Sequence, residues 1–150
     1  MGFVPILEKD WKTIPAELSD KYIMLGLPQQ LINSRVVNEN EDSRVIGSVV
    51  PVGIIIERLK ESPEQILKTT YPRFVGRLDF GNSKSSFEDI TGMSGGPIIG
   101  FNEALNRYWV VAVQSSWLPE SKITFGCLIP VFAQLVEDWL QDSKPSQITE

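Results

Sequence analysis

Short runs of apolar residues, several of them alternating with polar positions, recur along the chain and predict β-strands. At 73–80 every second position, from Phe74 to Phe80, is apolar or glycine, which predicts a strand with one buried face. Residues 45–56 are dense in β-branched side chains and predict one long strand, or two that meet at a bend near Gly47 or at 51–53. The other predicted strands cover 22–27, 34–37, 97–100, 108–113 and 123–129.

Two segments carry helical signals. Ser62, Pro63 and Gln65 provide a capping residue, a first-turn proline and a capping box, so a short helix is expected near 63–68. Residues 130–141 have apolar side chains at helical spacing and predict a C-terminal amphipathic helix whose apolar stripe packs in the core. That stripe consists of Phe132, Leu135, Val136, Trp139 and Leu140.

The predicted strands outnumber the helices, which indicates an all-β barrel or sandwich. The strand at 97–100 is expected to pair with the one at 108–113 as a hairpin. A chain of 150 residues is long enough to bury one core, and we expect a single domain over 1–141. Its start, 1–20, is expected to be linker-like, and the polar end, 142–150, to be a frayed tail.

Composition excludes several kinds of chemistry. The net charge of −5 argues against a non-specific nucleic-acid binder. The single cysteine, Cys127, allows no intrachain disulfide and no thiolate zinc site, and we expect it to be a buried apolar residue of a strand. The chain has no histidine, which removes the commonest general base and metal ligand and any complete Ser–His–Asp triad. We therefore expect no cofactor, no metal and no nucleic-acid partner.

The chain also lacks the marks of a membrane or exported protein. No apolar run reaches the length of a membrane span, and the charged start does not resemble a signal peptide. With a lone cysteine, these features favour a cytoplasmic location and no membrane partner.

The sequence GMSGGP at 92–97 is the most specific motif. By average residue usage, its five glycine, serine and proline letters match by chance about once in 10⁶ windows. A serine nucleophile must project from a tight turn, and glycines permit the backbone angles that such a turn needs. The N–H groups of Gly92 and Ser94 would then form an oxyanion hole, which binds the negative oxygen of a transition state. Ser94 has one alternative role, as part of a glycine-rich turn that has no catalytic function. The alternative for the oxyanion hole is the same turn with one of the two N–H groups pointing elsewhere.

This motif resembles the nucleophile loop of the trypsin-like (chymotrypsin-fold) serine peptidases. Residues 111–117, which end in Ser116 and Trp117, resemble the following strand of that family, which lines the substrate cleft. Residues 129–140 resemble its closing strand and C-terminal helix. Met93 stands where the family usually has Asp or Asn, which argues against activation by a freed N-terminus; many bacterial-type members share this departure.

The resemblance implies an antiparallel barrel like the family's second barrel, and hydrolysis of peptide bonds through an acyl-enzyme on Ser94. The N-H of Gly92 would be the second oxyanion donor. The base and its orienting aspartate would come from outside this chain, since the family carries them on the N-terminal barrel. Two explanations stay open: the chain is the C-terminal half of a longer peptidase, or it is a stand-alone relic. The expected substrate-binding residues are Ser115, Ser116, Trp117 and Glu88.

Each of these roles has an alternative. Glu88 and Asp89 lie where the family builds the floor of its specificity pocket, so they would favour basic side chains, or they are solvated loop acids. Lys84 or Lys122 would serve as the base of a Ser–Lys dyad, although nothing in their spacing supports it. A competing function is a catalytically inactive module that binds a protein or forms a homodimer, because half of a two-barrel domain exposes an apolar face.

Overall fold

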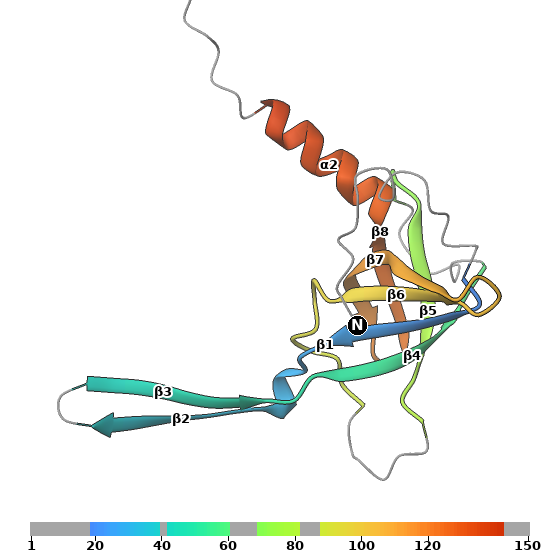
Figure 1. The fold of residues 1–150 in the computed structure, drawn as a ribbon. Coiled ribbons are helices and arrows are strands. Elements are labelled where there is room, and N and C mark those ends of the chain that lie inside the picture. Colours follow the sequence, from blue (N-terminus) through green and yellow to red (C-terminus); the bar gives the residue numbers. More distant parts are fainter. Residues whose placement is uncertain (1–18, 40–41, 61–68, 82–87, 143–150) are drawn as a thin grey trace, which may run out of the picture.

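A closed antiparallel barrel of six strands forms the centre of the protein, so the all-β barrel expected from the sequence is confirmed (Figure 1). The structure, a computed structural model, describes residues 19–39, 42–60, 69–81 and 88–142. The barrel strands are β1 (Lys21–Gly26), β4 (Val52–Arg58), β5 (Arg73–Asp79), β6 (Pro97–Asn102), β7 (Arg107–Leu118) and β8 (Ile123–Leu128). Around the barrel they follow the order β1–β4–β5–β8–β7–β6, and the pairing of β6 with β1 closes it.

Between β1 and β4 the chain forms a separate hairpin that extends away from the barrel (Figure 1). A short 3-10 turn, η2 (Gln29–Leu31), leads into β2 (Ile32–Glu39), which pairs with β3 (Asp42–Val49). The strand predicted at 34–37 lies within β2. The β-branched segment 45–56 contributes to both β3 and β4, and it breaks at 50–51, where Pro51 lacks the N–H that a continuous ladder would use.

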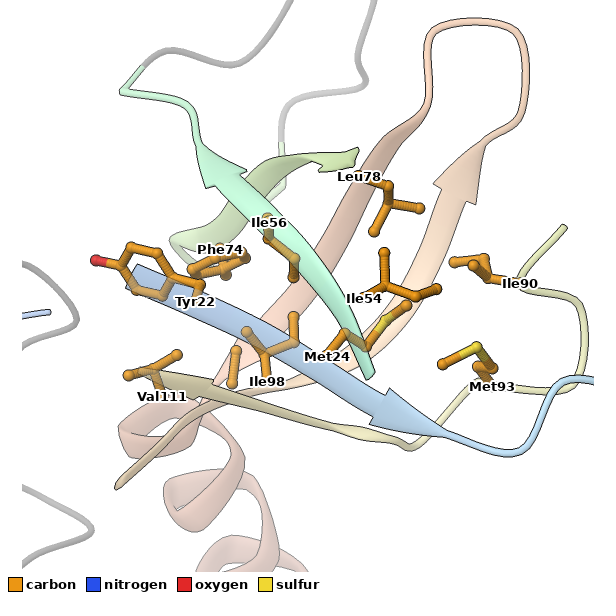
Figure 2. Packing of buried hydrophobic residues seen from close by; sticks show 11 residues of the cluster. Tyr22, Met24, Ile54, Ile56, Phe74, Leu78, Ile90, Met93, Ile98 and Val111 are labelled. Carbon is orange, nitrogen blue, oxygen red and sulfur yellow. The ribbon is translucent and has the colours of Figure 1, made fainter. Parts of the chain in front are cut away.

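Alternate strand positions point apolar side chains into the barrel. Phe74 and Leu78, 0% and 3% exposed, confirm the buried face predicted for β5. The main cluster consists of Tyr22, Met24, Ile54, Ile56, Phe74, Leu78, Ile90, Met93, Ile98, Val111 and Ala112 (Figure 2). Val75 lies on the face of β5 that the alternation assigns to solvent, yet it is buried, because it packs with Ile123 and Phe125 in a second small cluster.

The hairpin predicted from 97–100 and 108–113 is confirmed by the pairing of β6 with β7. β7 is longer than predicted and continues to Leu118, through the polar pair Ser115 and Ser116. The register of β7 against β8 shifts between Gln114 and Ser116, which marks a β-bulge.

The C-terminal helix is confirmed as α2 (Ile129–Asp142), but its predicted burial is wrong. In the described part of the chain, Ala133 is its only buried residue. Phe132 and Leu140 of the apolar stripe are 43% and 51% exposed, and Trp139 is 67% exposed. The reason is geometric: the helix leaves the end of β8 and runs away from the barrel (Figure 1), so its stripe does not reach the core.

Three predictions fall outside the described residues: the helix near 63–68, most of the linker-like start at 1–20, and the tail beyond Asp142. Asp142 itself is the last residue of α2. Within the described ranges, no helix is both long enough and apolar enough to cross a membrane.

Candidate functional site

The glycine-rich segment 92–97 forms the turn that leads into β6, and two buried residues anchor it. Ile90 and Met93 are 2% and 1% exposed, and Figure 2 shows them at one end of the core cluster. The N–H of Met93 donates to the Ile90 carbonyl (2.9 Å), and the N–H of Gly96 donates to the Met93 carbonyl (2.9 Å). Ser94, which directly follows Met93, is exposed, so the turn presents a serine hydroxyl to solvent.

Backbone N–H groups along this turn alternate between paired and free. The N–H of Thr91 donates to the carboxylate of Asp89 (2.8 Å), and that of Met93 is paired within the turn. Within the described part of the chain, the N–H groups of Gly92 and Ser94 form no hydrogen bond. The N–H groups of two exposed residues, on either side of Met93, therefore have no partner among the described residues. An oxyanion hole requires two such donors that converge on one oxygen atom.

Gly95 and Gly96 fix the turn between two strands of the barrel. The N–H of Gly95 donates to the Gln114 carbonyl in β7, and the N–H of Gln114 donates to the Gly96 carbonyl, both at 2.9 Å. On the other side, a Cβ added to Gly96 would lie 2.4 Å from the carbonyl oxygen of Leu25 in β1. The φ angles of Gly92 (+92°) and Gly95 (+84°) are in the left-handed region that glycine tolerates. The turn thus lies between the end of β1 and Gln114 of β7, as the barrel order requires.

Asp89 joins the turn to the segment that follows β1. Its carboxylate accepts hydrogen bonds from the hydroxyl (2.6 Å) and the N–H (2.8 Å) of Thr91, and from Nε2 of Gln30 (3.3 Å). These hydrogen bonds, led by that of the Thr91 hydroxyl, lower the pKa of the Asp89 carboxyl below its ordinary value. The N–H of Gln29 also donates to the Thr91 carbonyl (2.8 Å). The η2 segment, which leads into the β2–β3 hairpin, therefore supports the turn directly.

A shallow groove of about 350 Å³ lies beside the turn, on the β1 side. It is lined by Leu25, Gly26, Leu27, Pro51, Gly92, Met93, Ser94, Gly96 and Pro97. None of these residues is charged, and Leu25 and Leu27 remain 40% and 44% exposed despite their apolar side chains. A wider cavity of about 610 Å³ lies at the other end of β1, around Tyr22 and Arg58, away from the turn.

The predicted substrate residues of β7 lie on the opposite side of the turn from this groove, and none of them lines it. Ser115 is exposed, and its hydroxyl donates to the Phe125 carbonyl (3.2 Å). Ser116 is exposed, and its carbonyl accepts a hydrogen bond from the Thr124 hydroxyl (3.4 Å). Trp117 is half-buried and packs against the main core cluster. The residue of β7 that pairs with the turn is Gln114, which directly precedes them.

Glu88 and the candidate lysine bases have partners of their own or lie outside the described ranges. Glu88 is exposed, and its carboxylate lies 3.6 Å from Nζ of Lys122. The same Nζ lies 5.4 Å from the centre of the Phe80 ring. No hydrogen bond joins Lys122 to Ser94 in the described residues. Lys84, the other candidate for a Ser–Lys dyad, is outside them.

The Ser94 hydroxyl forms no hydrogen bond with another described residue, so this part of the chain supplies no general base to it. Among the described residues there is also no cluster of three or more His, Cys, Asp or Glu side chains placed to hold a metal ion. Cys127 in β8 is half-buried rather than fully buried, and burial raises the pKa of its thiol.

The groove residues Leu25, Leu27 and Pro51 were not among the residues singled out from the sequence. In the sequence they belong to an apolar run and to a strand break, which are ordinary features of β-proteins. Only the closure of the barrel, which places β1 beside β6, brings them next to Ser94. Gln29 and Gln30 carry no recognisable motif either, and their role depends on the same closure.

Comparison with protein-family models, with curated proteins and with solved structures finds no match to this chain.

Proposed function

We propose that this chain is the nucleophile-bearing half of a trypsin-like serine endopeptidase and that it forms an acyl-enzyme on Ser94. The observation that carries the proposal is the pair of free N–H groups, those of Gly92 and Ser94, beside an exposed serine hydroxyl. The motif at 92–97 resembles the family's nucleophile loop. A closed antiparallel barrel, with this turn at the start of β6, is compatible with that resemblance.

In the proposed reaction, Oγ of Ser94 attacks the carbonyl carbon of a peptide bond, and its proton passes to a base. The carbonyl oxygen gains negative charge and accepts hydrogen bonds from the N–H groups of Gly92 and Ser94. The carbon–nitrogen bond then breaks, the base returns its proton to the leaving amine, and the acyl group remains on Ser94. Water attacks this ester by the same route, which releases a carboxylic acid and restores the serine.

The turn holds its two donors in place before a substrate arrives. Burial of Met93 and the two hydrogen bonds between Gln114 and the Gly95–Gly96 pair fix the backbone on both sides of Ser94. Donors that do not have to reorganise during the reaction stabilise a developing charge most effectively. A turn held in this way is compatible with a catalytic role.

The family's base is a histidine, and this sequence contains none, so under this proposal the base comes from outside the chain. The proposal assigns the histidine and its orienting aspartate to an N-terminal barrel. Without them an oxyanion hole retains only a small part of the rate enhancement, so the chain alone is expected to be nearly inactive.

Labelling with a fluorophosphonate, which reacts with activated serines, tests this proposal. We expect mass spectrometry to find the label on Ser94 when the chain is combined with an N-terminal barrel that carries histidine and aspartate. Labelling of the chain alone should be slower by at least about a hundredfold, the contribution of a general base. Ser94→Ala should abolish labelling, whereas Ser121→Ala, a change in the exposed turn after β7, should not. A combined protein that stays unlabelled, or equal labelling of Ser94→Ala, contradicts the proposal.

A non-catalytic module that binds a protein or forms a homodimer is the second candidate, and the exposed apolar stripe of α2 favours it. This function predicts no labelling of Ser94 in any combination and an affinity for the partner that Ser94→Ala leaves unchanged. Sedimentation velocity of the chain over a range of concentrations would reveal a homodimer.

A further inference from the structure

The groove beside Ser94 and the predicted substrate strand lie on different sides of the turn. β6 is paired with β1 on one edge and with β7 on the other. The segment before β6 therefore has Leu25 and Leu27 on one side and Gln114 of β7 on the other. Ser94 lines the groove, whereas Glu88 and Trp117 do not.

The chemistry of the groove is uniform. Its walls are Leu25, Leu27, Pro51 and Pro97, and Met93 forms part of its floor. A charged side chain placed here would find no partner of opposite charge among the lining residues. An aliphatic or aromatic side chain would instead remove from water the exposed surfaces of Leu25 and Leu27.

The polar groups at the edge of the groove complete this complementarity. Among the described residues that line the groove, the N–H groups of Gly92 and Ser94 have no partner, and neither does the Ser94 hydroxyl. The two N–H groups carry partial positive charge and match a carbonyl oxygen of a peptide backbone. An occupant that combines a backbone carbonyl with an adjacent apolar side chain satisfies both parts of the site.

We infer that the groove selects peptides by receiving an aliphatic or aromatic side chain that flanks the bond next to Ser94; this inference rests on the proposed peptidase function. Peptides with an apolar residue at this position should bind more tightly than peptides with a charged residue there. This selectivity differs from the preference for basic side chains that Glu88 would give, and the ion pair of Glu88 with Lys122 already offsets that carboxylate.

The test is a titration of the ¹⁵N-labelled chain with the peptides acetyl-Ala-Ala-X-Ala-Ala-amide, where X is Leu, Phe, Lys or Glu, followed by NMR. We expect the Leu and Phe peptides to bind about tenfold more tightly than the Lys and Glu peptides, the gain from burying one apolar side chain. The amide signals of Leu27, Gly92 and Ser94 should shift.

Leu27→Lys should weaken binding of the Leu peptide about tenfold, and Leu27→Met should retain it. Both changes are at a side chain that is 44% exposed, so the barrel should still fold. Leu105→Lys is the matched control: Leu105 is 56% exposed and lies in the turn at the far end of β6, so binding should stay unchanged. Equal binding of the Leu and Lys peptides, no binding of any peptide, or an unchanged affinity of Leu27→Lys would overturn the inference.

Failure of the groove and failure of the proposed function give different results. If Ser94 is labelled in the combined protein but the peptides bind without regard to X, the peptidase proposal stands and the groove has no selective role. If the Leu peptide binds and shifts Leu27, but Ser94 is never labelled, the groove is a binding site without the proposed catalysis.

Discussion

Two glycines of the turn have positive φ angles, and their surroundings differ. Gly92 lies against the segment after β1, where an added Cβ would be 3.0 Å from the backbone nitrogen of Gln29. Gly95 has no atom within 4 Å of the same hypothetical Cβ. The backbone angle alone therefore requires glycine at Gly95, whereas both the angle and the close packing require it at Gly92.

We expect Gly92→Ala to lower the free energy of unfolding by about 1–3 kcal/mol, since it combines left-handed strain with crowding at Gln29. Gly95→Ala, the matched control, should cost only the strain, about 1–2 kcal/mol. Urea denaturation of both variants measures the difference. A smaller loss for Gly92→Ala than for Gly95→Ala would contradict the packing of this turn against η2.

Asp89 makes the stability of the turn depend on pH. Because its pKa is lowered from 3.8 in the folded protein, the ionised carboxylate stabilises the fold above that value, and the contribution is lost as the pH falls through the lower folded pKa. Asp89→Asn should therefore be less stable than the wild type at pH 7, by an amount that shrinks as the pH drops below 3.8. Thr91→Val should raise the pKa of Asp89 toward 3.8 in an NMR titration. A stability difference that does not change with pH would be inconsistent with these hydrogen bonds.

At the scale of secondary structure, the local pattern was sufficient for most elements. Phe74 and Leu78 share a face because side chains on one face of a strand repeat every second residue, and this period is visible in the sequence. The full length of β7 was not visible, because Ser115 and Ser116 interrupt the apolar pattern at a β-bulge. The glycine-rich turn was found by its motif, but its groove was not, since that depends on which strand ends meet.

The helix α2 shows the limit of periodicity as a guide to burial. Its stripe has the spacing of a buried face, but spacing alone does not specify what lies opposite the helix. We expect Leu140→Ala to lower the free energy of unfolding by less than about 1 kcal/mol, because this side chain is 51% exposed. Leu78→Ala, at 3% exposure in the barrel, should cost about 2–5 kcal/mol. Similar losses for the two variants in urea denaturation would show that the stripe is packed.

On the scale of the whole molecule, the barrel and the hairpin are separate sheets, and the barrel is closed without β2 and β3. Because the barrel closes without the hairpin, we expect that the hairpin can be shortened without unfolding the protein. Ile32 and Val49 face each other at its base, so replacing 33–48 with Asn-Gly would leave a two-residue turn between paired positions. We expect this variant to unfold in one cooperative transition, with a change in the free energy of unfolding of about 1 kcal/mol or less. Loss of the cooperative transition in urea would mean that the hairpin is part of the stable core.

Closure of the barrel through β1 and β6 also has a consequence for biosynthesis. Tyr22 in β1 pairs with Gly100 in β6. The ribosome must therefore add about 80 residues after β1 before β6 can cover the second edge of β1. At about 5–20 residues per second, translation alone leaves that edge open for roughly 4–16 s. During this interval Ile23 and its neighbours form an unpaired strand edge, so the nascent chain is most exposed to aggregation before β6 has been synthesised.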